Sequence, residues 1–381
     1  MKQIRVVLAG GGSGGHTYPL VAVAESLRRF ASESGMELSL SYLGPNDQWS
    51  TLLAGYGIKV RHLMAAKMRR YVSILNLVDI PKFFISILQA FWTLFWTMPD
   101  AILSKGGPGA LPVVLAGWFY RIPIVIHESD AVPGLTNRIS AWFADRVTVS
   151  FDRALAYFNP RKSLWTGHPI RNEILSDNLS VVAARETFHC TGEQPLLVVL
   201  GGSQGSRRIN EFLVVILKDL IQSAQILHQT GTNGFEETNK LSATALADPS
   251  YSSEMRSRYH SVAYLDDPGM KAALIAADLV MARAGSNIFE IAAFGKPAVL
   301  IPLAEAANDH QRANAYEFAK SGGAIIIEEE NLLPEIVLAQ LQHLLKNPDR
   351  MNQMAVGSGK FFKQGGAEAV AREVWRSCDE R

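Results

Sequence analysis

The chain has 381 residues, of which 48% are hydrophobic and 19% are charged, and its formal net charge is +1. This balance predicts two folded globular domains, excludes a disordered chain, and gives no general case for nucleic-acid binding. The two cysteines, Cys190 and Cys378, cannot form a disulfide framework and lack metal-ligand spacing, which is typical of a reducing compartment.

The first predicted strand, 4–9, runs into the glycine-rich turn 10–15, and a helix is predicted over 18–31. Glycines let backbone N–H groups surround an anion, and a helix N-terminus adds partial positive charge. The glycine spacing matches a dinucleotide fingerprint, but the next predicted strand, 38–43, has no acidic residue at its end to hold a ribose. A Walker A lysine–serine pair is missing too, so NAD, FAD and NTP hydrolysis are disfavoured. The turn therefore predicts a phosphate site or the close approach of an acceptor.

His16 directly follows this turn, at the expected start of the helix. An imidazole has a near-neutral pKa and can remove a proton from an alcohol. A histidine that only caps the turn is the alternative, and both interpretations fit this position.

An uncharged apolar segment lies at 83–98. It is about 16 residues long, shorter than the roughly 20 that a membrane span needs. Upstream, Lys67, Arg69 and Arg70 are interleaved with large apolar side chains, which suits an anionic membrane surface. Two interpretations are open: a helix partly buried and partly facing lipid headgroups, or an ordinary core helix with a solvated basic flank.

The rest of the first half alternates strands with helices, predicted near 100–104, 109–119, 122–127, 134–143 and 146–150. Such alternation predicts a parallel sheet covered on both faces. Glu128 and Asp130 follow one of these strands at its carboxyl end, where open α/β sheets place functional groups. Either carboxylate can hold sugar hydroxyls or act as a base, and a solvated strand-end turn is the alternative.

The second half repeats the pattern. Its strands are predicted near 196–200, 224–228, 260–264, 278–282, 297–301 and 323–327. Its helices are predicted near 208–222, 269–276, 286–294, 308–321 and 334–346. A second glycine-rich turn, 201–206, follows the first of these strands. Segment 158–163 predicts the crossover between two domains, 1–162 and 163–360, and residues 361–381 predict a final helix that can pack on either domain.

A small-residue turn follows the predicted strand 278–282. Ser286 can cap the next helix, whose free N–H groups can face a phosphate. Glu290 lies about one turn further on, in reach of a ribose diol, although alone it could be a solvated helix charge. Phosphate and ribose contacts at this spacing predict a nucleoside-diphosphate site.

Two further groups of polar residues are candidate ligand contacts: one at the start of the predicted helix 308–321, and one near the start of the second half of the chain. His310, Gln311 and Asn314 are neutral donors and acceptors typical of sugar-hydroxyl contacts, and a polar helix start is the alternative. Arg171 is a candidate for a diphosphate contact, because a guanidinium fork matches phosphate oxygens. A surface arginine is its alternative.

Taken together, these segments resemble the MurG family. The resemblance covers the chain from Gly10 to about Gly323 and is carried by GGGSGGHTYP, KMRRY, SKGG, IHESDAVPGLTNR, TGHPIR, GGSQGS, HQTG, RAGSNIFEIAAFGKP and DHQRANA. Nine segments in family order make it specific.

The resemblance implies an α/β protein with the GT-B fold, in which two Rossmann-like domains with parallel sheets face a central cleft. It implies an inverting glycosyltransferase that moves N-acetylglucosamine from UDP-GlcNAc to the C4 hydroxyl of undecaprenyl-pyrophosphoryl-N-acetylmuramyl-pentapeptide in peptidoglycan synthesis. It also implies a peripheral protein on an anionic surface, the cytoplasmic face of the bacterial inner membrane, and fits a cell-wall synthesis complex. No tightly bound cofactor is implied; no metal motif is evident, and Mg²⁺ is compatible but not required.

The resemblance also carries roles onto single residues. His16 is the first choice for the catalytic base and Asp130 the second, with Glu128 in the same acceptor-side loop. The implied substrate contacts are Ser13, Gly14, Gly15, His16, Asn137, Arg171, Ser203, Gln204, Gly205, Leu265, Ser286, Glu290, His310, Gln311 and Asn314.

Two segments depart from the family pattern. Residues 108–110 lack the aromatic–Val–Ser run of many relatives, and 303–307 lacks the usual aromatic or basic residues. The rival functions are a related GT-B transferase with another acceptor, a UDP-sugar epimerase, and a membrane-recruited binding subunit without turnover. An intact donor site argues against the last, and the apolar and basic segment at 64–98 argues against the epimerase.

Overall fold

The computed structural model describes residues 3–64, 74–107, 109–175, 179–190, 192–202, 204–304 and 309–379, with the backbone alone for 74–78. The chain forms two compact units. The first comprises the chain up to Asn172 together with the segment from Lys363 onward, and the second comprises Glu173–Phe362.

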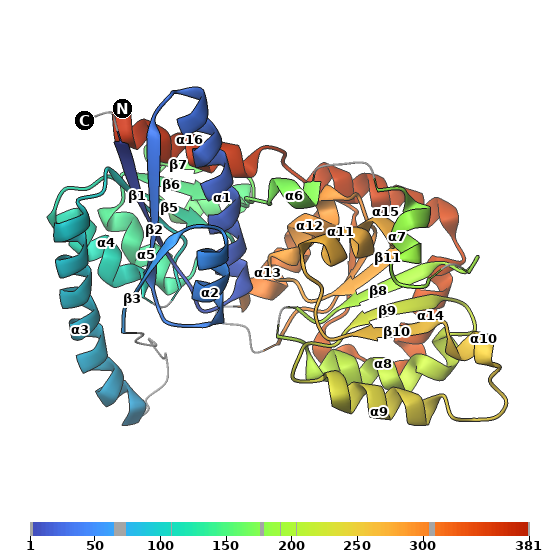
Figure 1. Ribbon diagram of the computed structural model, residues 1–381. Coiled ribbons are helices and arrows are strands. Elements are labelled where there is room, and N and C mark those ends of the chain that lie inside the picture. The colour runs from blue at the N-terminus through green and yellow to red at the C-terminus, as the bar shows by residue number, and fades with distance from the viewer. Residues whose placement is uncertain are drawn as a thin grey trace. The chain divides into compact units, whose positions relative to one another are not determined.

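The first unit is built on a seven-stranded parallel sheet with the order β3-β2-β1-β4-β5-β6-β7 (Figure 1). Its strands are β1 Gln3–Ala9, β2 Glu37–Gly44, β3 Lys59–His62, β4 Ala101–Ser104, β5 Ile124–Glu128, β6 Arg146–Val149 and β7 Ser163–Trp165. Its helices are α1 Gly14–Glu33, α2 Gln48–Gly55, α3 Ile74–Thr97, α4 Ala110–Phe119, α5 Leu135–Phe143, the 3₁₀ helix Asp152–Tyr157 and α16 Gly366–Asp379.

The second unit carries a six-stranded parallel sheet with the order β10-β9-β8-β11-β12-β13. Its strands are β8 Leu196–Leu200, β9 Gln225–Gln229, β10 Tyr259–Val262, β11 Leu279–Ala282, β12 Ala298–Leu300 and β13 Ala324–Ile326. Its helices are α7 Val181–Glu186, α8 Arg207–Leu220, α9 Phe235–Ala245, α10 Ser253–Arg256, α11 Asp267–Ala276, α12 Asn287–Ala293, α13 His310–Lys320, the 3₁₀ helix Glu329–Asn331, α14 Pro334–Leu345 and α15 Pro348–Phe361. The short helix α6, Asn172–Leu175, spans the boundary between the units.

The central strands β4, β5 and β8 are buried along their whole length, as in a parallel sheet covered on both faces, whereas the edge strands β3 and β7 are partly exposed. In the first unit, Leu8 of β1 packs with Leu27 of α1 and Val370 of α16 in one core cluster. The last helix therefore completes the first unit, one of the two packings that the sequence allowed.

The structure divides the chain after Asn172 rather than after Lys162. The reason is β7, whose residues 163–165 pair with β6 and extend the first sheet by one strand. The segment 163–172 follows this strand into the first unit.

Candidate active site

The first glycine-rich turn joins β1 to α1 at the carboxyl edge of the first sheet. Gly11 and Gly12 have φ values of +126° and +90°, and a Cβ on Gly11 would lie 2.5 Å from the Tyr42 hydroxyl. Tyr42 Oη donates to Gly10 O at 2.7 Å, and the Gly12 N–H donates to Asp47 Oδ2 at 3.1 Å. Glycine is required here because the backbone approaches β2 and the loop after it so closely.

The start of α1 carries the predicted contacts of this turn. Ser13 is the N-cap with an extended backbone, and its side chain makes no capping hydrogen bond within the described chain. Gly14 packs on Trp49: a Cβ on Gly14 would stand 3.0 Å from the Trp49 ring. Gly15 is the next residue in the first turn of α1. The first N–H groups of α1 and the positive end of its dipole thus lie at the carboxyl edge, which suits an anion.

His16 lies in the first turn of α1 and is half-buried. Its ring lies against residues 106–107, the turn that follows β4. A Cβ on Gly107 would stand 3.4 Å from His16 Cδ2 and 3.5 Å from Nε2. Gly107 has a φ of +83°. The structure therefore brings the imidazole from the end of β1 to the residues that follow β4, as a base for a substrate bound at this edge requires.

The Glu128 carboxylate at the end of β5 accepts three hydrogen bonds. Oε1 accepts from the Asp130 N–H at 2.9 Å, and Oε2 accepts from the Gly134 N–H at 3.1 Å and Asn137 Nδ2 at 2.9 Å. Burial and the charge of Asp130 raise the pKa of Glu128 to about 6, although Lys105 and the hydrogen bonds from the Asp130 N–H and Asn137 oppose the rise. A carboxylate occupied in this way holds the loop that follows it, and Asp130 in that loop is half-exposed.

Asn137 lies on α5 and packs against the turn 106–107 that follows β4. Its Nδ2 donates to Glu128 and to His127 O at 3.3 Å, and its buried Oδ1 has no hydrogen-bond partner within the described chain. A Cβ on Gly106, where φ is +81°, would lie 2.6 Å from Oδ1. The amide of Asn137 thus holds the acceptor-side loop through Glu128 and packs closely against Gly106 of the turn after β4.

A buried polar chain beneath this edge was not among the predicted site residues. Lys105 Nζ donates to Ser129 Oγ, which lies 3.3 Å from His168 Nδ1. His168 Nδ1 lies 3.0 Å from Ser150 Oγ, and Ser150 Oγ lies 3.0 Å from His127 Nε2. Lysine and histidine at the ends of predicted strands were the available signal, but their burial depends on tertiary packing that the sequence does not show.

Arg171 is buried in the first unit, at 3% exposure. Its guanidinium stacks on the ring of Tyr18, 3.7 Å from the centroid. It was expected to begin the donor domain, but it belongs with α1 and the first glycine turn. Its contact with the diphosphate of the donor, which the resemblance implies, stays a prediction.

The second glycine-rich turn, after β8, is held against the loop after β9. A Cβ on Gly205 would lie 2.2 Å from Thr230 O. Ser206 caps α8 by accepting from the Ile209 N–H at 3.4 Å. The predicted contact Gln204 is exposed beside this turn, and Ser203 lies outside the described residues.

Arg283, at the end of β11, holds this turn by a hydrogen bond to Ser206 and was not among the predicted contacts. Its guanidinium donates to Ser206 Oγ at 2.8 Å and to Ile301 O at 3.1 Å, and it pairs with Glu329. Burial would raise the pKa of the Glu329 carboxyl, but hydrogen bonds from Arg283 and the Ala304 N–H outweigh that effect and lower it. One side chain thus connects the loops after β8, β11 and β12.

The turn after β11 leads into α12, where the expected capping bond is absent. Ser286 is the N-cap, but its φ and ψ of −63° and −19° are helical, and its side chain makes no capping hydrogen bond within the described chain. A capping side chain needs an extended backbone. Asn314 of α13 is buried and donates from Nδ2 to Ala284 O at 3.1 Å, so it positions this turn. Glu290 lies in the first turn of α12, half-exposed.

The remaining predicted contacts lie around the same edge of the second sheet. Gln311 Oε1 accepts from the Leu303 N–H at 3.0 Å, and His310 begins α13 beside it. Leu265 is buried just before α11. Parts of the two divergent segments, Pro108 and 305–307, lie outside the described residues, as do the basic residues Lys67, Arg69 and Arg70.

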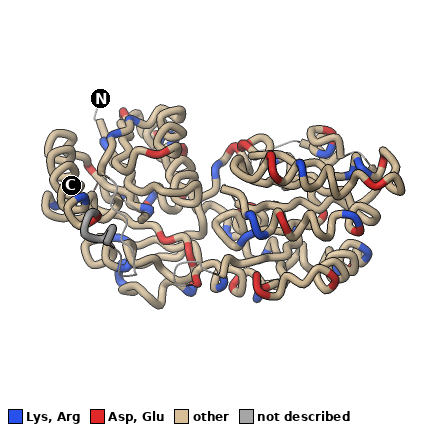
Figure 2. Tube along the Cα trace, turned by 90° about the horizontal axis from the view of Figure 1, so that it is seen from below, with Lys and Arg blue, Asp and Glu red and all other residues tan. Residues whose placement is uncertain are grey.

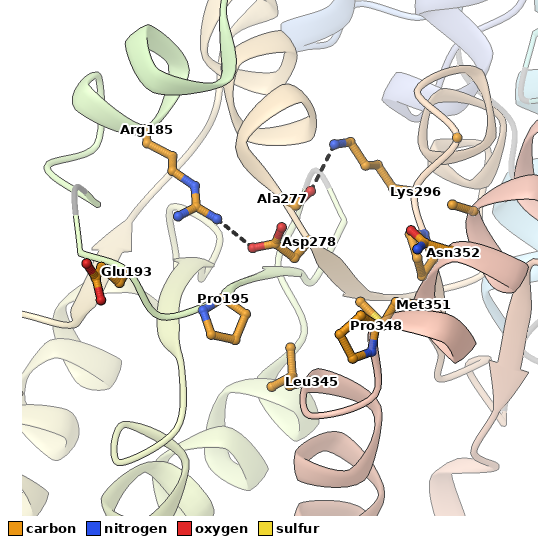
Figure 3. Close-up of a pocket in the computed structure, with 13 residues that line it drawn as sticks. Arg185, Glu193, Pro195, Ala277, Asp278, Lys296, Leu345, Pro348, Met351 and Asn352 are labelled. Carbon is orange, nitrogen blue, oxygen red and sulfur yellow. Dashed lines mark hydrogen bonds and ion pairs between the residues drawn. The ribbon is translucent and has the colours of Figure 1, made fainter.

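Among the described residues, no group of three His, Cys, Asp or Glu side chains lies close enough to hold a metal ion. Lys and Arg are interspersed with Asp and Glu in both units (Figure 2). A pocket of about 440 Å³ in the second unit lies at the amino edge of its sheet, where Pro195, Asp278 and Pro297 precede β8, β11 and β12 (Figure 3). Ligands of open α/β sheets bind at the opposite, carboxyl edge, so this pocket is separate from the candidate site.

Comparison with known proteins matches both halves of the chain. The glycosyltransferase family 28 N-terminal domain matches residues 6–149, and the family 28 C-terminal domain matches residues 196–370. A UDP-N-acetylglucosamine–N-acetylmuramyl-(pentapeptide) pyrophosphoryl-undecaprenol N-acetylglucosamine transferase of Clostridium perfringens is 33% identical over 366 residues, which cover 94% of this chain and 96% of the relative.

Solved structures agree with this match. The crystal structure of Acinetobacter baumannii MurG superposes with a TM-score of 0.73 at 26% identity, covering 98% of this chain and 99% of that one. A UDP-GlcNAc 2-epimerase from Neisseria meningitidis, solved with UDP-GlcNAc, has a TM-score of 0.65 at 11% identity and covers 100% of both chains. The second likeness concerns the fold alone.

Proposed function

Because the chain belongs to the MurG family of glycosyltransferases, we propose that it transfers N-acetylglucosamine from UDP-N-acetylglucosamine to the C4 hydroxyl of an N-acetylmuramyl-pentapeptide carried on undecaprenyl diphosphate. The observation that carries the proposal is the match to a transferase of this activity along 94% of the chain. Polar residues at the carboxyl edge of each sheet support it, since such edges bind ligands in α/β proteins.

The acceptor is assigned to the first unit. Its diphosphate would be met by the N-terminus of α1, and its sugar by the loop that Glu128 and Asn137 hold. His16 takes the proton from the C4 hydroxyl as that oxygen forms a bond to the anomeric carbon of the donor. The bond from that carbon to UDP breaks at the same time, so UDP leaves with the electron pair and the anomeric configuration inverts.

The donor is assigned to the second unit. The turn that Arg283 and Ser206 hold, together with the start of α12, offers N–H groups to the diphosphate, where negative charge grows as UDP leaves. Glu290 accepts hydrogen bonds from the ribose, and Gln311 and His310 lie near the transferred sugar. No step requires a metal ion; a loosely bound Mg²⁺ on the diphosphate is compatible with this arrangement.

Replacement of Glu290 by alanine is expected to raise the KM for UDP-GlcNAc roughly tenfold or more, because hydrogen bonds to a charged group are lost. Steady-state kinetics with saturating acceptor measure this. Glu236→Ala is the matched control, since Glu236 is an exposed glutamate in the first turn of α9. Equal KM values in the two variants would remove Glu290 from the ribose site.

We further propose that the first unit binds a membrane surface through α3. The helix places Phe84, Leu88, Trp92 and Trp96 at four-residue spacing, and all four are exposed, Leu88 by 69% and Trp92 by 67%. Residues at this spacing share one helix face, and Trp is favoured at membrane interfaces. No described helix is long and apolar enough to cross a membrane. One face of the segment 83–98 is thus solvent-exposed, which favours the lipid-facing interpretation over an ordinary core helix.

The double change Trp92→Ser and Trp96→Ser is expected to weaken binding to anionic vesicles roughly tenfold or more, since each exposed indole would otherwise bury apolar area in lipid. Vesicle sedimentation measures this. The control pair Val215→Ser and Val356→Ser removes exposed apolar side chains from the second unit. Equal binding by both double variants would refute the assignment to α3.

The transfer reaction is tested by acceptor-dependent release of UDP. The protein is incubated with UDP-GlcNAc, UDP-glucose or UDP-galactose, with and without a muramyl-pentapeptide diphosphate on a short polyprenyl chain. Rapid release with UDP-GlcNAc, only when the acceptor is present, is expected. Equal release with all three donors, or release that ignores the acceptor, would point to a different transferase.

A further inference from the structure

Lys105 is a fully buried lysine at the end of β4, and it has no part in the mechanism above. Its exposed fraction is 1%, and its ammonium donates to the neutral Ser129 hydroxyl. Lysine is almost never buried to this extent unless another charge compensates it. Ser129 carries no charge, so the compensating groups must be sought among its neighbours.

The two histidines near Lys105, His127 and His168, carry no charge. Thr148 Oγ1 donates to Ile126 O at 3.0 Å, so it accepts from His127 Nδ1–H at 2.9 Å. Ser150 Oγ lies 3.0 Å from both His127 Nε2 and His168 Nδ1. Both rings are neutral, because burial, followed by the charge of Lys105, lowers the pKa of each histidine.

The anionic groups acting on Lys105 are Glu128 and Asp130, which follow β5, the strand next to β4. Burial lowers the pKa of Lys105, and these two carboxylates oppose that change. The attraction is mutual, since Lys105 also lowers the pKa of Glu128 against the effects of burial and Asp130. The ionisable groups around Lys105 are thus two carboxylates and two neutral histidines, with His16 of α1 beside the following turn.

We propose that Lys105 is a positioning residue for the acceptor: its buried ammonium keeps the Glu128 carboxylate ionised, and the ionised carboxylate holds Asn137 and the loop 130–134 in place. Protonation of Glu128 would turn one acceptor oxygen into a donor that faces an N–H group, so a hydrogen bond to the loop would be lost. This inference deepens the proposed function and rests on it for the identity of the acceptor.

The direct test needs no activity. Enzyme labelled with ¹³C at the glutamate and aspartate carboxyl carbons is titrated by NMR, as wild type and as Lys105→Gln and Lys105→Met. Glutamine keeps a donor for Ser129 but loses the charge, so it separates the two roles of Lys105. We expect the Glu128 midpoint, about 6 in the wild type, to rise by roughly one pH unit in both variants.

The matched control is Lys296→Met. Lys296 is a largely buried lysine at the amino edge of the second sheet, where its ammonium donates to Ala277 O (Figure 3) and to Ile275 O. Its loss should leave the Glu128 midpoint unchanged. A wild-type midpoint for Glu128 in Lys105→Gln would overturn the proposal, because the lysine would then act only through its hydrogen bond.

A kinetic test follows from the sign of this effect. Loss of the cation raises the pKa at which the carboxylate protonates, so the acidic limb of kcat/KM for the acceptor should move to higher pH in Lys105→Gln. The KM for UDP-GlcNAc should stay unchanged. If kcat/KM fell equally at every pH, and its acidic limb stayed at the wild-type pH, the positioning role of Lys105 would be refuted. An inactive wild-type enzyme would refute the proposed function instead, while the NMR titration would still decide the role of Lys105.

Discussion

His16→Ala is expected to lower kcat for sugar transfer roughly 10²–10⁴-fold, because the attacking hydroxyl loses its general base. The affinity for UDP should stay at the wild-type value, since His16 is assigned to the acceptor, and the predicted ribose contact Glu290 belongs to the second unit. Single-turnover kinetics and calorimetric titration with UDP measure the two quantities separately.

The control for this variant is His343→Ala, an exposed histidine on α14 of the second unit. It should keep wild-type turnover. Turnover of His16→Ala within a few-fold of that control would remove His16 as the base and leave Asp130, the half-exposed carboxylate of the acceptor-side loop, as the candidate. Asp130→Asn would then show the large loss of kcat.

Arg283→Met is expected to destabilise the second unit by about 3–5 kcal/mol and to weaken UDP binding. The change leaves the Glu329 carboxylate without its cation in a place where both side chains are largely buried, at 9% and 15% exposure. It also removes the donors to Ser206 Oγ and Ile301 O, which fix the turn after β8. Urea unfolding with and without UDP measures both effects.

A surface ion pair provides the comparison. Arg207 pairs with Glu211 one turn further along α8, but its side chain is 80% exposed. Arg207→Met should hardly move the unfolding midpoint, because solvent screens exposed pairs. If the two arginine variants had the same unfolding midpoint, the buried ion pair would stabilise the protein no more than a surface pair does. Arg283 would then not stabilise the turn after β8.

The sequence predicts the central strands and the two glycine turns because their apolar runs and small residues are local signals. It misses β3 and β7, since both are short, lie at the sheet edges and carry exposed residues such as Arg61 and Trp165. It also misses α9, whose sequence FEETNKLSATA has few apolar residues to mark a helical face.

The candidate site divides in the same way. His16 and Glu290 lie where strand ends and helix starts predict them, and the apolar segment at 83–98 proves to be exposed along one face. The capping bond of Ser286 fails because a helical φ and ψ at that residue cannot be inferred from its type. Lys105 and Arg283 could not be selected, because their importance comes from burial against residues far away in the chain.

The most direct test of the whole account is transfer of radiolabelled N-acetylglucosamine from UDP to an undecaprenyl-diphosphate muramyl-pentapeptide. We expect the label to enter the lipid fraction in a β linkage at C4 of the muramyl sugar, with one UDP released for each sugar transferred. Release of UDP with no label in the lipid, or label in a different linkage, would contradict the assignment of this chain as the transferase of that acceptor.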